Sequence, residues 1–161
     1  MPYILREMKE SDIPAVQKVA KTTWNATYEG LIPQETQEKF IRLAYSDDRM
    51  LLRLERSLLL VAEADEEVVG FVNLSFPNDE GKVKLGAIYI YPEFQGAGIG
   101  SALLEKGITQ LEKAKEIYVD VEQGNVNGIK FYKARGFQTI REFDDEIGGY
   151  KLKTVEMILN L

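Results

Sequence analysis

The segment 88–101 constrains the fold of this 161-residue sequence more than any other part of the chain. A predicted strand ends at Pro92, and three alternating glycines then lead directly into an amphipathic stretch that begins at Ser101. The first N–H groups of a helix lack internal partners and carry partial positive charge, and glycines let an anion approach the main chain. The segment therefore predicts an anion site, for which a diphosphate is a natural guest.

Two other phosphate-binding loops are alternatives for this segment. The mononucleotide loop requires a Lys-Ser or Lys-Thr pair after the glycines, and none is present. The dinucleotide loop fits better, because Gly96 and Gly98 match, Ser101 takes the third position, and Asp120 follows about 20 residues later. Against it, residues 92–95 separate the strand from the first glycine, and the chain ends in two strands rather than a repeated βαβ unit. NAD(P) binding stays open as an alternative.

The rest of the chain predicts one α/β or α+β domain of residues 1–161, in which helices are interleaved with a mixed sheet. Ser11 and Asp47 are predicted as helix caps, Gly136 as a helix end, and 144–149 as a loop between the last two strands. Strands are predicted at 3–6, 58–64, 68–76, 83–91, 117–121, 137–143 and 152–159. Helices are predicted at 11–27, 34–44, 47–55, 101–114 and 126–135.

Composition excludes several classes of function. Cysteine and histidine are both absent, so disulfides, Ser-His-Asp triads, cysteine nucleophiles and zinc sites of the Cys/His type are ruled out. The net charge of −6 disfavours nucleic acid and anionic membranes as partners. The N-terminus is charged from Arg6 onward, and the longest apolar run, 58–62, is far too short to span a bilayer. We expect a cytoplasmic protein.

Two motifs resemble the GNAT superfamily of N-acetyltransferases. Residues 95–100 match the pattern Q/R-x-x-G-x-G/A, and residues 125–137 match N-x-x-A-x-x-F-Y-x-x-x-G-F, except that Gly128 replaces the usual alanine. The resemblance implies a mixed, mostly antiparallel twisted sheet of about seven strands flanked by helices on both faces. It also implies transfer of an acetyl group from acetyl-CoA to an amine, without a metal.

The resemblance also implies roles for individual residues. Asn125 would bond the coenzyme near its pantetheine arm, and Tyr132 would lie near the thioester sulfur and protonate the departing thiolate. The pantetheine arm would pair with the main chain of Ile88, Tyr89 and Ile90. The pyrophosphate would be held by Gln95, Gly96, Ala97, Gly98, Ile99, Gly100 and Ser101.

The general base is less clear from the sequence. An alkyl ammonium with a pKa of about 10.4 must lose a proton before it attacks, and a main-chain N–H of the coenzyme strand would stabilise the oxyanion. Asp120 and Glu122 lie two residues apart on one predicted strand and so share a face, which makes both candidates. The alternative is that either is simply a solvated charge at the end of the strand. Gly86 and Ala87 place no carboxylate on the coenzyme strand, which leaves room for a base that acts through water.

Two segments suggest a cationic acceptor. Residues 142–146 form a predicted acidic loop, and the last two strands flank the acceptor site in this family. Trp24, Tyr28 and Glu29 offer aromatic faces and a carboxylate to an ammonium group, and their segment resembles polyamine N-acetyltransferases of the PaiA type. Trp24 and Tyr28 are equally well explained as the buried face of a helix. We expect the acceptor to be a polyamine such as spermidine or spermine. The alternatives are that the acceptor is a protein N-terminus, an amino acid or another small amine, or that the protein is a non-catalytic acyl-CoA sensor. Homodimers are common in the family, so a homodimer is an expectation by analogy.

Overall fold

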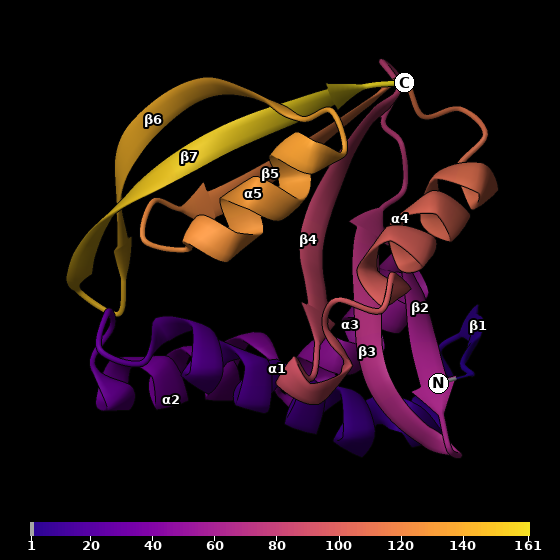
Figure 1. Cartoon of the computed structure of the whole chain (residues 1–161), viewed down its shortest axis with the longest axis horizontal. Coiled ribbons are helices and arrows are strands. Elements are labelled where there is room, and N and C mark those ends of the chain that lie inside the picture. Colours follow the sequence, from indigo (N-terminus) through magenta and orange to yellow (C-terminus); the bar gives the residue numbers. More distant parts are fainter. Residues whose placement is uncertain (1) are drawn as a thin grey trace.

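The computed structural model describes residues 2–161, so that Met1 of the predicted domain lies outside the described residues. Within them, seven strands form one sheet in the order β1-β2-β3-β4-β5-β7-β6 (Figure 1). The strands are β1 (Ile4–Glu7), β2 (Ser57–Ala64), β3 (Glu67–Ser75), β4 (Lys82–Ile90), β5 (Glu116–Glu122), β6 (Gln138–Ile147) and β7 (Tyr150–Asn160). The helices are α1 (Ile13–Tyr28), α2 (Gln34–Ala44), α3 (Asp47–Arg56), α4 (Ile99–Gln110) and α5 (Val126–Ala134).

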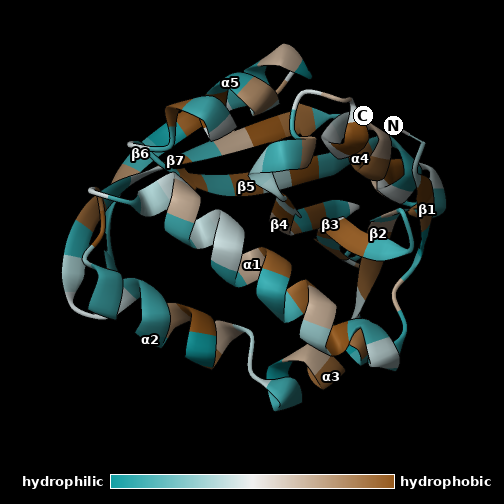
Figure 2. Cartoon of the chain, turned by 60° about the horizontal axis from the view of Figure 1, so that its bottom comes forward, coloured by the Kyte–Doolittle hydropathy of each residue, from teal (hydrophilic) through white to brown (hydrophobic). Residues whose placement is uncertain are grey.

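The sheet is mixed and mostly antiparallel, as predicted. Neighbouring strands run antiparallel except β4 and β5, which are parallel. Helices α1, α2 and α3 cover one face and α4 and α5 the other (Figure 2). Strand β2 has an unbroken apolar run from Leu58 to Ala62, because Leu58 and Leu60 pack on the α4 side while Leu59 and Val61 pack on the α1 side.

Several predicted boundaries need correction. Ser11 lies in a short 3-10 turn, Glu10–Asp12, and Asp12 rather than Ser11 is the N-cap of α1. Helix α3 is capped by Ser46, whose hydroxyl accepts from Arg49 N–H at 3.3 Å, and Asp47 is its first helical residue. Helix α4 begins at Ile99, because its N-cap Gly98 is still in the left-handed conformation.

The predicted loop at 144–149 is wrong for most of its length. Strands β6 and β7 continue through it and pair as far as Ile147 and Tyr150. Only Gly148 and Gly149 form the turn, with φ values of 55° and 83° that glycine adopts without strain. The cross-strand ladder therefore extends further than the run of acidic residues suggested, because glycines at the turn allow a tight two-residue connection.

Strands β4 and β5 diverge after a short contact, which is visible at the centre of Figure 1. They pair only at Lys82, Val83 and Lys84. Strand β3 follows β4 on to Ile90, across a bulge at which Asn73 faces Ala87 and Leu74 faces Leu85, while β5 follows β7. A bulge bends and twists its strand. The edge of β4 from Leu85 to Ile90 is consequently left without a partner strand.

Candidate active site

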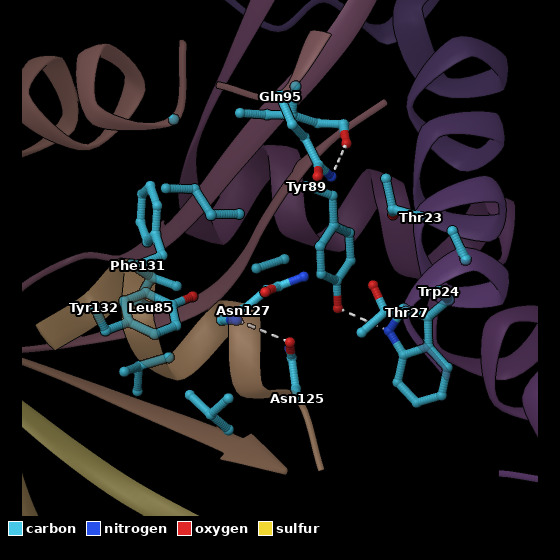
Figure 3. Close-up of a pocket in the computed structure, with 18 of the residues that line it drawn as sticks. Thr23, Trp24, Thr27, Leu85, Tyr89, Gln95, Asn125, Asn127, Phe131 and Tyr132 are labelled. Carbon is cyan, nitrogen blue, oxygen red and sulfur yellow. Dashed lines mark hydrogen bonds between the residues drawn. The ribbon is translucent and has the colours of Figure 1, made fainter. Parts of the chain in front are cut away.

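A cavity of about 830 Å³ occupies the gap between the diverging strands (Figure 3). Its walls come from β4, the loop before α4, the start of α4, strand β5, helix α5 and helix α1. Helix α1 covers one face of the sheet and α5 the other, so the cavity passes through the sheet itself. One molecule can thus approach from each face and meet the other in the gap.

The glycine loop forms one end of the cavity. Gly96 and Gly98 have φ values of 81° and 83°, and a Cβ atom at either would meet no protein atom within 4 Å. The first helical bond of α4 runs from Ala102 N–H to Gly98 O at 3.0 Å. Among residues 2–161, no acceptor binds the N–H groups from Gly96 to Ser101. The loop therefore presents a row of free main-chain donors to open space, which suits a phosphate group.

Gln95 ties this loop to the end of β4. Its side-chain Nε2 donates to Ile90 O at 2.9 Å. That carbonyl is therefore already engaged, whereas the edge at Ile88 and Tyr89 has no strand partner. The expected contact of the pantetheine arm with Ile88, Tyr89 and Ile90 remains a prediction. Tyr91 N–H donates to Val69 O, so in the alternating antiparallel register Tyr89 turns its main-chain groups to β3, and Ile88 offers the free groups at this edge.

Helix α5 contributes Tyr132. The side chain is buried, at 7% exposure, and packs between Phe131 and Phe137 with ring centroids 5.3 and 5.2 Å away. Its hydroxyl has no hydrogen-bond partner in the described part of the chain and points into the cavity (Figure 3). Burial, and then the charge of Glu122, raises the pKa of Tyr132 above 10. The phenol is thus a proton donor rather than an anion at neutral pH.

Asn125 caps the same helix. Its Oδ1 accepts from Gly128 N–H at 2.9 Å. A Cβ atom at Gly128 would lie 2.6 Å from Asn125 Nδ2, so glycine replaces the family's alanine where this amide folds over the helix end. The predicted bond from Asn125 to the coenzyme would have to use its remaining N–H groups.

Helix α1 and strand β5 form the other end of the cavity. The Tyr28 hydroxyl donates to Glu122 Oε2, and Trp24 Nε1 donates to the Tyr89 hydroxyl at 2.8 Å. Trp24 stacks on Phe40 with centroids 4.2 Å apart. Burial, and then the charge of Glu122, raises the pKa of Tyr28, so the phenol stays protonated and keeps donating to that carboxylate. The Trp24 ring is buried in the core and also borders the cavity, so its contact with an ammonium group stays a prediction.

The two candidate bases differ in their surroundings. Buried Val119 and Val121 alternate with Asp120 and Glu122, so the two carboxylates share one face of β5, as predicted. Both line the cavity. Asp120 forms a 2.7 Å ion pair with Lys84 and is 39% exposed, whereas Glu122 is half-buried beneath α1.

Not all of the expected acceptor residues reach this end. Glu29 is exposed and lies outside the cavity lining, and so do residues 142–146, which belong to the exposed strand β6 rather than to a loop over the site. The cavity also has lining residues that the sequence reasoning missed: Thr23, Thr27, Phe40, Asn127, Phe131 and Arg135. For Arg135 a signal existed, since it follows Phe131 by four residues and so shares its helix face.

Comparison with known proteins decides the family. The sequence model of the acetyltransferase (GNAT) family matches residues 20–137. The chain belongs to this family. The chain is 30% identical over 146 residues to a spermidine N(1)-acetyltransferase of Thermoplasma acidophilum, with 86% of this chain and 89% of that protein covered. A spermine/spermidine N(1)-acetyltransferase of Bacillus subtilis is 31% identical over 56% of this chain and 64% of its own length.

Solved structures agree with the fold. The PaiA N-acetyltransferase of Thermoplasma acidophilum, determined in complex with coenzyme A, superimposes with a TM-score of 0.87 at 27% identity, and both chains are covered completely. The Escherichia coli ribosomal-protein-S18-alanine N-acetyltransferase superimposes with a TM-score of 0.74 at 19% identity, over 99% of this chain and 94% of that one, which shows the fold alone.

This chain is therefore an acetyl-CoA-dependent N-acetyltransferase, and the dinucleotide-binding alternative is not supported. Independently of these comparisons, the residues that line the cavity fit the coenzyme. The free edge of β4 can pair with an extended amide-containing arm, and the open cradle at Gly96 and Gly98 can take phosphate oxygens. No helix within residues 2–161 is both long enough and apolar enough to cross a membrane.

Proposed function

We propose that this enzyme acetylates a primary amine of a polyamine such as spermidine or spermine. The observation that carries the proposal is the Tyr28–Glu122 pair at the end of the cavity opposite the glycine loop. A half-buried carboxylate held by a phenol, whose ring lies against that of Trp24, suits an alkyl ammonium, which gains both a charged partner and aromatic faces. The names of two relatives support the same acceptor class.

The distribution of charge in the cavity agrees with a cationic acceptor. Among the described lining residues the acids are Asp120 and Glu122, both on β5, and the single base is Arg135, which lies against α4 at the other end. A molecule with several ammonium groups would meet negative charge near α1 and positive charge only near the glycine loop. A polyamine and the phosphates of the coenzyme therefore have separate, matched ends.

The reaction joins the acceptor nitrogen to the acetyl carbon and breaks the carbon–sulfur bond. Glu122 would bind the ammonium and accept its proton, directly or through water, with the Tyr28 O–H bond helping to hold the carboxylate in place. Asp120 is the weaker candidate because Lys84 already neutralises it. A main-chain N–H on the free edge of β4 would stabilise the charge on the carbonyl oxygen, and Tyr132 would return a proton to the sulfur.

The proposal is tested by release of free thiol from acetyl-CoA with a panel of acceptors. Spermidine and spermine should give kcat/KM values at least tenfold above those for amino acids, aminoglycosides and peptides with free N-termini, because only polyamines carry several ammonium groups on a flexible apolar stem. Mass spectrometry of the product should show one acetyl group on a primary nitrogen. A peptide as best acceptor, or coenzyme binding without turnover of any polyamine, would contradict the proposal.

A further inference from the structure

Strand β4 has one residue more than its partner β3 at the level of the cavity. Gly86 stands between the partners of Asn73 and Leu74 and has no partner of its own on β3. It also lines the cavity. Because main-chain groups alternate in direction along a strand, the extra residue exchanges which groups of β4 turn toward β3 and which turn toward the gap. The bulge therefore decides that Ile88 offers its main-chain groups to the gap.

Asn73 lies opposite this bulge, and its side chain is buried, at 5% exposure. Its Oδ1 accepts from Arg53 Nη1 at 2.7 Å, while its Nδ2 donates to Ser57 Oγ at 2.8 Å and to Leu58 O at 3.2 Å. The Ser57 hydroxyl donates in turn to Arg53 O at 2.6 Å. Asn73, Ser57 and Arg53 thus form a closed ring of hydrogen bonds that joins α3, the start of β2, and β3.

Arg53 anchors this ring to the helices. Its Nη2 donates to Ala44 O, at the end of α2, at 3.1 Å, and its guanidinium carbon lies 4.6 Å from the centroid of the Tyr45 ring. Within residues 2–161, no carboxylate forms an ion pair with Arg53. Neutral acceptors and an aromatic ring therefore fix the guanidinium, so that it orients its partners rather than balancing a charge.

The hydrogen-bonded ring contacts the bulge from behind. A Cβ atom at Gly86 would lie 3.6 Å from both Asn73 O and Asn73 Oδ1, and 3.9 Å from Arg53 Nη1. These are ordinary contact distances, and neither Asn73 nor Arg53 lines the cavity. Loss of the guanidinium would leave Asn73 Oδ1 buried without this donor. The amide could then regain a partner only by moving against the main chain of the bulge.

We propose that Arg53 is a positioning residue, which acts through Asn73 to hold the bulge of β4 so that Ile88 N–H points at the carbonyl oxygen of the bound acetyl group. Such a donor is effective only when its position is fixed before the reaction, and its complete loss typically lowers kcat about 100- to 1,000-fold. The inference rests on the proposed reaction, in which an N–H of β4 stabilises the oxyanion. It does not depend on which amine is the acceptor.

The kinetic test compares the wild-type enzyme with Arg53→Met, which keeps the aliphatic stem and removes every donor. With the best acceptor of the panel, kcat should fall about tenfold, because the N–H is displaced rather than lost, while KM for the amine and CoA affinity stay within about twofold. Arg53→Lys should recover most of kcat, since an ammonium can still donate to Asn73 Oδ1. Arg56→Met is the matched control, because Arg56 is exposed on the same helix, and it should have normal kcat.

A spectroscopic test needs no acceptor. Infrared difference spectra of bound acetyl-CoA, isotopically labelled at the thioester carbonyl, report how strongly that carbonyl is polarised. The C=O stretching frequency should be lower in the wild type than in Arg53→Met, because the variant presents Ile88 N–H in a displaced position. Arg53→Lys should lie close to the wild type. Because no amine is present, this result is independent of the polyamine proposal.

Three results would overturn the inference. Unchanged kcat in Arg53→Met would show that the bulge does not need Arg53. Parallel losses of kcat, CoA affinity and thermal stability, without recovery in Arg53→Lys, would show a purely structural role. Reduced kcat with an unchanged carbonyl frequency would show that Arg53 does not act through Ile88. Should Arg53→Met fold poorly, Ser57→Ala opens the ring but leaves Asn73 bonded to Leu58 O. It should lower kcat about threefold and raise the carbonyl frequency, and no change in either would refute the role of the ring.

Discussion

The two ends of the cavity are built from different chemical groups. The end proposed for the coenzyme presents main-chain N–H groups, the left-handed glycines Gly96 and Gly98, and the free edge of β4. The end proposed for the acceptor presents the side chains of Trp24, Tyr28 and Glu122, which come from elements far apart in the chain. A main-chain site tolerates changes of most side chains but not of backbone conformation, while a side-chain site can change its ligand by single substitutions.

The largest expected effect is a loss of CoA affinity when the glycine loop is altered. Gly98→Val would force a branched side chain into the left-handed conformation, at about 1–2 kcal/mol, and would fill the space intended for phosphate. CoA affinity should fall on the order of 100-fold by calorimetry, as two or more charge-assisted bonds are lost. Gly149→Val is the matched control, because Gly149 has the same φ of +83° and the same open surroundings, but lies outside the cavity. Normal CoA affinity in Gly98→Val would refute the loop assignment.

The next largest effect is expected on kcat when the Tyr132 hydroxyl, which faces the cavity, is removed. Tyr132→Phe should lower kcat on the order of 100-fold with near-normal CoA affinity, because only proton donation to sulfur is removed. Since the pKa of Tyr132 is raised above 10, the wild-type phenol stays protonated at higher pH than a free tyrosine. The kcat–pH profile should therefore show no alkaline loss from this group below pH 10. Unchanged turnover in the variant would exclude Tyr132 from the mechanism.

A smaller effect, on kcat/KM for the amine, is expected when the carboxylates of Glu122 and Asp120 are replaced one at a time and compared. Glu122→Gln should reduce kcat/KM for the amine about tenfold and leave CoA affinity unchanged, because the ammonium loses its charged partner. Asp120→Asn should change it less than about twofold, since the Lys84 ion pair already neutralises Asp120 and is exposed to solvent. The reverse order of effects in steady-state kinetics would move the base to Asp120.

The smallest effect tests the phenol that holds Glu122. Tyr28→Phe keeps the ring against Trp24 and removes only the O–H bond to the carboxylate. We expect KM for the amine to rise about threefold with little change in kcat, since one neutral donor to a charged acceptor is lost. A change in kcat alone, with KM constant, would instead place Tyr28 in proton transfer.

The sequence predicted the local structure of the glycine loop well because its determinants are contiguous. Three glycines and the following helix fall within a dozen residues, so that one motif specifies a local structure that tertiary packing hardly alters. The order and type of the strands were also predictable, because apolar runs such as 58–62 are bounded by clear turns. The predicted α2 agrees with the structure at both ends.

The acceptor end was harder because it depends on packing between distant segments. The acidic run at 142–146 suggested a clamp, yet pairing with β7 places it on an exposed strand outside the cavity. Trp24 could not be assigned to core or cavity from helical spacing, because spacing shows which face is apolar and not what covers it. Arg135 escaped notice because its partner, Ser101, lies 34 positions away in the sequence.

The three-residue contact between β4 and β5 has a mechanical consequence. Strands β1 to β4 carry α1, α3 and α4 on their faces, and β5 to β7 form a second ladder of their own. The sheet is thus two plates joined by a short seam at Lys82, Val83 and Lys84. Few interstrand hydrogen bonds therefore hold the two halves together, and their cohesion rests instead on the core that Leu85, Val119 and Met157 share across the gap.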